Sequence, residues 1–142
     1  MHLHILRKND LETVLDLFCE CFISDHYYQQ LFAGCDDISV AMRDAFRSSI
    51  SFCLEKGISV GIVNNGKLLA FALFFDYKKT QDSRRASFNE IFGVHDGDQL
   101  PYYENLHHEI ENLKGEVLYL LSIAVSTDYR QCGLASGLID YM

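Results

Sequence analysis

The sequence lacks most of the features that would divide it or place it in a membrane. Only one proline occurs among its 142 residues, and we find no proline-rich linker, low-complexity tract or internal repeat. The apolar run at 117–125 is too short to span a membrane. Residues 1–5 lack the charged segment and the long apolar stretch of a secretory signal. We therefore expect a single domain over residues 1–142 of a cytoplasmic protein.

The cysteines lack the spacing of a disulfide or metal framework. There are five of them, an odd number, and no C-x-x-C pair occurs. Cys19 and Cys21, with His26 nearby, come nearest to a metal site, but residues two apart on a helix point to different faces. We expect reduced thiols and no metal ion.

Positive charge is also scarce. Lysine and arginine number 12 against 20 acidic residues, which gives a net charge of −8. This balance argues against non-specific binding to nucleic acid or to an anionic membrane. It would suit a cationic amine as a binding partner. With 49% hydrophobic and 23% charged residues, the composition is otherwise that of an ordinary globular domain.

Alternation and helical spacing predict regular elements in the first half of the chain. Residues 2–7 alternate as a short strand does, and Asp10 stands at the N-cap position of a helix over about 11–23. A second helix starts after the aspartates at 36–37 and ends at Gly57, in the C′ position.

A hairpin follows the second helix. Residues 58–62 alternate, Asn65 and Gly66 are the signal of a two-residue type I′ turn, and 68–75 form the returning strand. Residues 24–26 break the first helix, and the sequence does not decide the form of 27–32. Three further expectations concern the remaining segments: a loop at 76–85, short helices at 88–92 and 102–113, and surface positions for His107 and His108.

The C-terminal stretch carries the chemistry. Its apolar run at 117–125 has the pattern of a strand that is buried on both faces, and a polar break at 126–128 follows. A helix then starts, with Leu134, Leu138, Ile139 and Met142 expected on one side. A helix start leaves backbone N–H groups without partners and carries partial positive charge, so this segment predicts an anion site.

Small residues and a cation suit this loop to a phosphate. Gly133 and Ala135 would let a phosphate approach the main chain, and Arg130 adds a full positive charge. A Walker A loop is excluded because no lysine follows Gly137. The spacing of small residues at 133, 135 and 137 also departs from the G-x-G-x-x-G dinucleotide fingerprint.

These residues resemble motif A of the GNAT superfamily of N-acetyltransferases, [QR]-x-x-G-x-[GA]. Arg130, Gly133 and Ala135 occupy the three fixed positions, and the surrounding strand and helix are also similar to that family. The resemblance implies an α/β (α+β) fold with a mixed, mostly antiparallel sheet and flanking helices. The implied element order is β-α-α-β-β-β-α.

The resemblance also implies a reaction and its site. Acetyl would pass directly from acetyl-CoA to a primary amine on a small molecule or peptide, with no metal. Main-chain groups of Ile123, Ala124 and Val125 would hold the acetyl-pantetheine end, and the pyrophosphate would lie on N–H groups beside Arg130. Those N–H groups belong to Gln131, Cys132, Gly133, Leu134, Ala135 and Ser136.

The sequence offers two candidates for the general base, Tyr119 and Glu116, and does not choose between them. Some members of the family carry a glutamate within this strand, at the place that Tyr119 occupies here. Tyr119 shares an alternation face with Leu121 and Ile123 but has an ordinary pKa near 10, whereas Glu116 has the right chemistry on the other face.

The resemblance covers the first two thirds of a GNAT domain, so we expect a domain that is incomplete after the helix of the phosphate loop. The strand at 117–125 would then have an unpaired apolar edge, which proteins normally cover. We expect a homodimer that covers it. Two functions stay open: an N-acyltransferase, or a non-catalytic half-domain that binds CoA or a protein partner.

Overall fold

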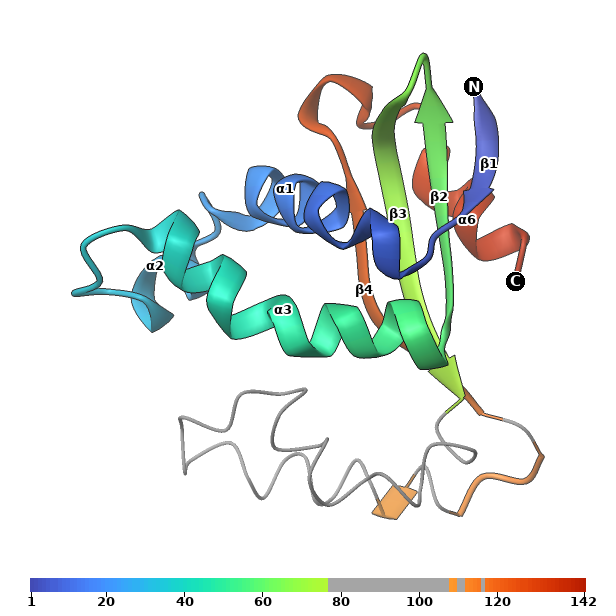
Figure 1. The fold of residues 1–142 in the computed structure, drawn as a ribbon. Coiled ribbons are helices and arrows are strands. Elements are labelled where there is room, and N and C mark those ends of the chain that lie inside the picture. Colours follow the sequence, from blue (N-terminus) through green and yellow to red (C-terminus); the bar gives the residue numbers. More distant parts are fainter. Residues whose placement is uncertain (77–107, 110–111, 116) are drawn as a thin grey trace.

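The computed structural model describes residues 1–76, 108–109, 112–115 and 117–142, which form an antiparallel sheet with helices on both faces (Figure 1). The four strands lie in the order β1-β2-β3-β4, and every neighbouring pair is antiparallel. The predicted α+β class is therefore confirmed. The elements are β1 (His2–Ile5), the 3-10 turn η1 (Lys8–Asp10), α1 (Leu11–Phe22), α2 (His26–Leu31), α3 (Ile38–Lys56), β2 (Ile58–Asn64), β3 (Lys67–Asp76), β4 (Leu118–Val125), the 3-10 turn η3 (Thr127–Tyr129) and α6 (Leu134–Asp140).

The helix starts follow the predicted positions, with one difference in chemistry. The carboxylate of Asp37 accepts the N–H of Val40 at 3.1 Å and so caps α3 as predicted. Asp10 stands at the N-cap of α1, but its carboxylate accepts the N–H of Arg7 at 2.7 Å and does not cap that helix. The side chain of Asp10 therefore fixes the turn before α1 and makes no hydrogen bond to the first N–H groups of the helix.

Gly57 ends α3 for a different reason from the one that the sequence suggests. Its φ of −97° and ψ of −169° are extended, so the predicted C′ role, which needs a left-handed residue, is wrong. A Cβ at this position would lie 1.9 Å from the carbonyl oxygen of Phe74. Glycine is required here because the chain passes directly against the backbone of β3.

The hairpin between β2 and β3 agrees with its sequence signal. Asn65 and Gly66 have φ values of 49° and 77°, and the flanking pair is Asn64 with Lys67. Positive φ at both turn residues is the requirement of a type I′ turn. The prediction of this hairpin is confirmed.

The strand β3 separates two apolar clusters, one on each face of the sheet. Helices α1 and α3 cover one face and α6 covers the other (Figure 1). The side chains of β3 pack with residues of these helices. Every residue from Leu68 to Phe75 is at most 5% exposed. The first cluster includes Phe71, Leu73 and Phe75, and the second includes Ala70, Ala72 and Phe74.

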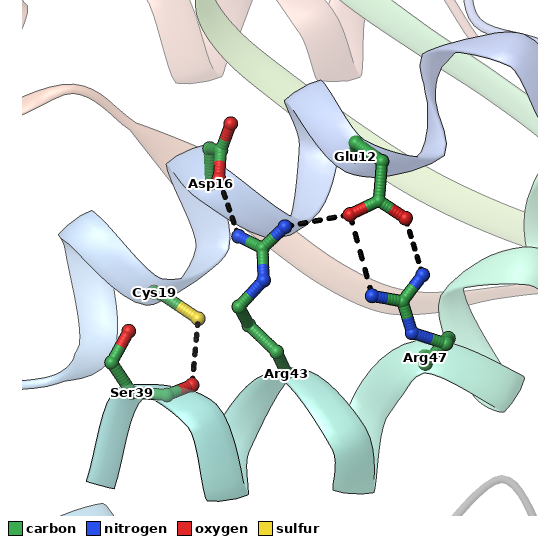
Figure 2. Close-up of polar contacts among 6 residues, drawn as sticks. All are labelled: Glu12, Asp16, Cys19, Ser39, Arg43 and Arg47. Carbon is green, nitrogen blue, oxygen red and sulfur yellow. Dashed lines mark hydrogen bonds and ion pairs between the residues drawn. The ribbon is translucent and has the colours of Figure 1, made fainter. Parts of the chain in front are cut away.

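The helices α1 and α3 are joined by ion pairs above the first cluster (Figure 2). Arg43 donates to Glu12 at 2.7 Å and also to Asp16, and Arg47 donates to both oxygens of Glu12. Because these side chains lie at the surface, we expect each pair to add little to stability.

The strand β4 is far less buried than its composition suggests. Ala124 is its only buried residue, and Leu118 and Leu120 are 41% and 37% exposed. The predicted burial on both faces is wrong for the first part of β4, because the α6 cluster reaches Ile123 and Val125 but not Leu118 or Leu120. Among the described strands, β4 pairs with β3 alone. The edge that the sequence predicts is therefore open in the part of the chain that the structure describes.

A β-bulge changes which residues of β4 share a face. Leu73 pairs with Ser122 and Phe74 pairs with Leu120, so the register skips Leu121. Tyr119 and Leu121 pack against the α1 and α3 cluster, whereas Ile123 packs against the α6 cluster. The predicted common face of Tyr119 and Ile123 is wrong, because strict alternation does not hold across a bulge.

The helix α6 is attached to the sheet through a narrow stripe. Leu138 is fully buried against Val60 and the small side chains of β3, and Leu134 is partly buried beside it. Ile139 and Met142 are 44% and 40% exposed, so their predicted place on the same side is wrong. One residue along a helix turns about 100°, which carries Ile139 off the stripe.

Some predictions fall outside the described residues. They concern residues 77–85 of the loop predicted at 76–85, the helix predicted at 88–92, most of the helix predicted at 102–113, His107 and Glu116. Of the described residues in these segments, Asp76 ends β3 and is not in a loop, and 108–109 are helical. No helix in the described part of the chain is long and apolar enough to cross a membrane.

Candidate functional site

A cleft of about 420 Å³ lies at the end of β4. Three parts of the chain form its walls: the end of α1, the last residues of β4, and the connection from η3 into α6. The lining residues are Cys21, Phe22, Ile123, Ala124, Val125, Tyr129, Arg130, Gln131, Gly133, Leu134, Ala135 and Ser136.

The cleft brings together every residue of the predicted cofactor set except Cys132. The Cys132 side chain is exposed and its thiol donates to the carbonyl of Arg130 at 3.5 Å. The predicted set also omitted Tyr129, which directly precedes Arg130, and two residues of α1. These two are Cys21 and Phe22, about a hundred residues earlier in the chain. No local pattern could have found them, because only tertiary packing brings the end of α1 to this point.

The open edge of β4 presents backbone groups to the cleft. The N–H of Ser126 donates to Leu69 of β3 at 2.8 Å, so the backbone of Ser126 faces the sheet. Because backbone groups alternate in direction along an antiparallel strand, those of Val125 and Ile123 point away from β3. The Val125 carbonyl confirms this, since it accepts from the Cys21 thiol at 3.3 Å and from Nε of Arg130 at 3.4 Å.

The turn after η3 depends on left-handed backbone. Gln131 has a φ of 61° and Gly133, the N-cap of α6, has a φ of 76°. A Cβ on Gly133 would meet no atom within 4 Å, so its φ, not crowding, favours glycine. The first N–H groups of α6 have no partners within the helix, and the residues that carry them line the cleft.

Arg130 places a positive charge at the wall of the cleft. Its guanidinium donates to the carbonyl oxygens of Val125, at 3.4 Å, and of Cys21, at 3.5 Å. Both distances are at the long end of the hydrogen-bond range, and the side chain is exposed. An anion in the cleft would therefore compete only with weak bonds for this cation.

The thiol of Cys21 is a donor in this arrangement and not a nucleophile. Burial raises the pKa of Cys21, and the hydrogen bond with Arg130 offsets part of that increase. The thiol therefore keeps its proton at neutral pH, where it donates to the carbonyl of Val125.

The candidate bases are not in the described wall of the cleft. Tyr119 does not line it, and the ring of Tyr119 packs against Phe75 with centroids 5.1 Å apart. Glu116 and His107 lie outside the described residues, and His108 is exposed on a short helical segment. The choice between Tyr119 and Glu116 stays a prediction.

The thiols of Cys19 and Cys21 point to different partners, as their spacing predicts. Cys19 contacts the carbonyl of Ser39 at 3.9 Å, and Cys21 contacts that of Val125 (Figure 2 shows the former). Among the described residues, no group of three metal-binding side chains is gathered.

Comparisons with solved structures match almost the whole chain at low identity. An agmatine N-acetyltransferase matches with a TM-score of 0.60 and 12% identity over 98% of this chain. The polyamine N-acetyltransferase of Drosophila melanogaster matches with a TM-score of 0.58 and 14% identity over 99%. A GNAT-like decarboxylase in complex with isobutyryl-CoA matches with a TM-score of 0.50 and 14% identity over 99%. Identities this low support a common fold only.

This chain spans about two thirds of the two acetyltransferases, covering 67% and 68% of them, and 56% of the decarboxylase. No protein-family model and no curated protein matches the sequence.

Proposed function

We propose that this chain, which has the GNAT acetyltransferase fold, binds acyl-CoA in the cleft at the end of β4. We propose further that it transfers the acyl group to a primary amine. One observation carries the proposal. The open backbone edge of β4, the guanidinium of Arg130 and the start of α6 all border a single cleft. A long, polar ligand with a thioester at one end and phosphates at the other matches that sequence of groups.

In the proposed complex, acetyl-CoA lies along the edge of β4. The outward backbone groups of Ile123 and the outward N–H of Val125 bind the amides of the pantetheine arm. The pyrophosphate lies at Gln131–Ser136, where N–H groups at the start of α6 and the charge of Arg130 favour an anion. Two solved structures of this fold are named as acetyltransferases of agmatine or polyamines, and a third contains isobutyryl-CoA.

The proposed chemistry is a direct transfer. The amine nitrogen attacks the thioester carbonyl, a C–N bond forms and the C–S bond breaks, and the proton lost from the amine ends on the CoA thiol. A free amine with a pKa of about 10 is mostly protonated at neutral pH, so a base must first remove a proton. Tyr119 and Glu116 are the candidate bases. The acidic net charge of −8 favours a cationic acceptor.

The alternative is a non-catalytic domain that binds CoA or a protein partner. It is favoured by the cleft wall itself, because the described lining contains no carboxylate or imidazole. Free CoA release from acetyl-CoA with a panel of polyamines, aminoglycosides and peptides separates the two functions. Binding without release would support the alternative.

Calorimetric titration of acetyl-CoA tests the binding proposal, with Gly133→Leu as the variant and Gly66→Leu as its control. The two glycines have φ values of 76° and 77°, and a Cβ on either meets no atom within 4 Å, so both variants carry the same backbone strain. Only Gly133 lines the cleft. We expect micromolar binding by the wild type and the control and at least tenfold weaker binding by Gly133→Leu. No binding by the folded wild type would refute the proposal.

The expected homodimer is tested separately. Sedimentation velocity over a range of concentrations should show a dimer if a second copy covers the edge of β4. Replacing the exposed Leu120 with lysine should then dissociate it.

A further inference from the structure

Glu20 is an acidic residue in an unfavourable place on its own helix. It lies in the last turn of α1, where the partial negative charge of the helix end repels a carboxylate, and that turn contains no basic residue. Its carboxylate therefore weakens α1 by itself. The carboxylate of Glu20 instead accepts hydrogen bonds from another part of the fold.

That contact is with the connection between β4 and α6. The hydroxyl of Ser126, which is 1% exposed, donates to Oε1 of Glu20 at 2.8 Å. The same oxygen accepts the N–H of Thr127 at 3.4 Å. Ser126 is the N-cap of η3 but makes no side-chain cap to that turn. Glu20 supplies the cap from another part of the chain.

The residue after Glu20 contacts the same connection at the wall of the cleft. Next along α1, the Cys21 thiol donates to Val125 and the Cys21 carbonyl accepts from Arg130. The end of α1 thus contacts the last residue of β4, the N-cap and first residue of η3, and the guanidinium of Arg130. Beyond Ser126, the connection turns through two left-handed residues, Gln131 and Gly133.

We propose that Glu20 is a positioning residue for the acyl-CoA cleft: its carboxylate fixes Ser126 and Thr127, and thereby the backbone that leads into the loop at 130–136. The role of Glu20 in binding rests on the proposed function, whereas the effect of Glu20 on the loop can be measured without any ligand. Glu20 does not line the cleft, so it acts through the backbone and not by touching the ligand.

The first arm of the test is hydrogen exchange of the ligand-free protein. We compare the wild type with Glu20→Ala, Glu20→Gln and Glu12→Ala, the last being a matched loss of a carboxylate from the first turn of α1. Glu20→Ala should accelerate exchange in peptides that cover 126–136 by about tenfold and leave β2 and β3 unchanged. Glu20→Gln should restore the wild-type rate, because its amide oxygen still accepts from Ser126.

The second arm is the calorimetric titration of acetyl-CoA with the same variants. Glu20→Ala should weaken binding by about fivefold to tenfold, as loss of a hydrogen bond predicts, with Glu20→Gln and Glu12→Ala near the wild type. Ser126→Ala removes the same bond from the other side and replaces Glu20→Ala if that variant does not fold.

The outcomes of the two arms are distinct. Unchanged loop exchange in Glu20→Ala, or equal acceleration in Glu12→Ala, would overturn the positioning role whatever the ligand does. Absence of acetyl-CoA binding by the wild type, together with the expected exchange pattern, would instead refute the proposed function and leave Glu20 as the residue that fixes this loop. Faster loop exchange with unchanged affinity would overturn its role in the cleft.

Discussion

The strands β3 and β4 have similar sequences and opposite surroundings. Both are near-continuous apolar runs, LLAFALFF in β3 and LYLLSIAV in β4. The first is buried along its whole apolar run between α1 and α3 on one face and α6 on the other, whereas the second has one buried residue. Apolar composition therefore identifies a strand, but position in the sheet decides what the strand does. Here β3 stabilises the fold and β4 presents the cleft.

The largest effect should come from one substitution made in both strands. Leu73 of β3 is fully buried and Leu120 of β4 is 37% exposed. Leu73→Ala should lower the free energy of unfolding by about 3 kcal/mol, and Leu120→Ala by about 1 kcal/mol or less. Urea denaturation of both variants measures the two values. Equal losses would mean that β4 is covered in solution by something that the isolated chain does not show.

The second comparison concerns two glycines. At Gly57 a Cβ would lie 1.9 Å from the carbonyl of Phe74 in β3 and 2.8 Å from that of Cys53, so Gly57→Ala should destabilise by about 2–3 kcal/mol. Gly137, inside α6, has no atom within 4 Å of its Cβ position. Gly137→Ala should stabilise by roughly 0.5–1 kcal/mol, since alanine favours a helix. Thermal unfolding midpoints that shift in the same direction would contradict this contrast.

The smallest effect concerns the ion pairs that join the two helices above β3. Hydrogen bonds with Arg47 and Arg43 lower the pKa of Glu12 from its ordinary 4.5 (Figure 2). A depressed folded pKa gives stability that is fully present above the unfolded pKa of 4.5 and is lost as the pH falls through the folded value.

Glu12→Gln should therefore flatten the decrease in melting temperature between pH 5 and pH 3, by an amount kept small by exposure to solvent. Melting temperatures of the wild type and the variant, measured at several pH values in low salt, provide the check. An unchanged slope in the variant would show that the ion pairs do not contribute.

Local signals in the sequence predicted the parts of this structure that depend on neighbouring residues. The hairpin at Asn65 and Gly66 has the φ values that its turn type requires, and Asp37 caps the helix that follows it. The loop residues Arg130, Gly133 and Ala135 line a cleft together. Each of these depends on contacts within a few residues, which spacing can encode.

Features that depend on distant residues were missed or wrongly predicted. The bulge at Leu121 arises from pairing with β3 and reverses the face of Tyr119, which strict alternation cannot anticipate. Gly57 is glycine because of Phe74, which is distant in sequence. The low burial of β4 and the α1 wall of the cleft both depend on how elements distant in sequence pack together.

The contacts that close the cleft also bear on the order in which the protein is made and folds. Cys21 and Val125 are separated by 104 residues, and Glu20 and Ser126 by 106. A chain growing from its N-terminus completes the hairpin of β2 and β3 long before it has the residues for the second wall. Contacts of such separation form slowly because a long loop must close first. We therefore expect the cleft to be among the last parts of the described fold to assemble, after the hairpin of β2 and β3 has formed.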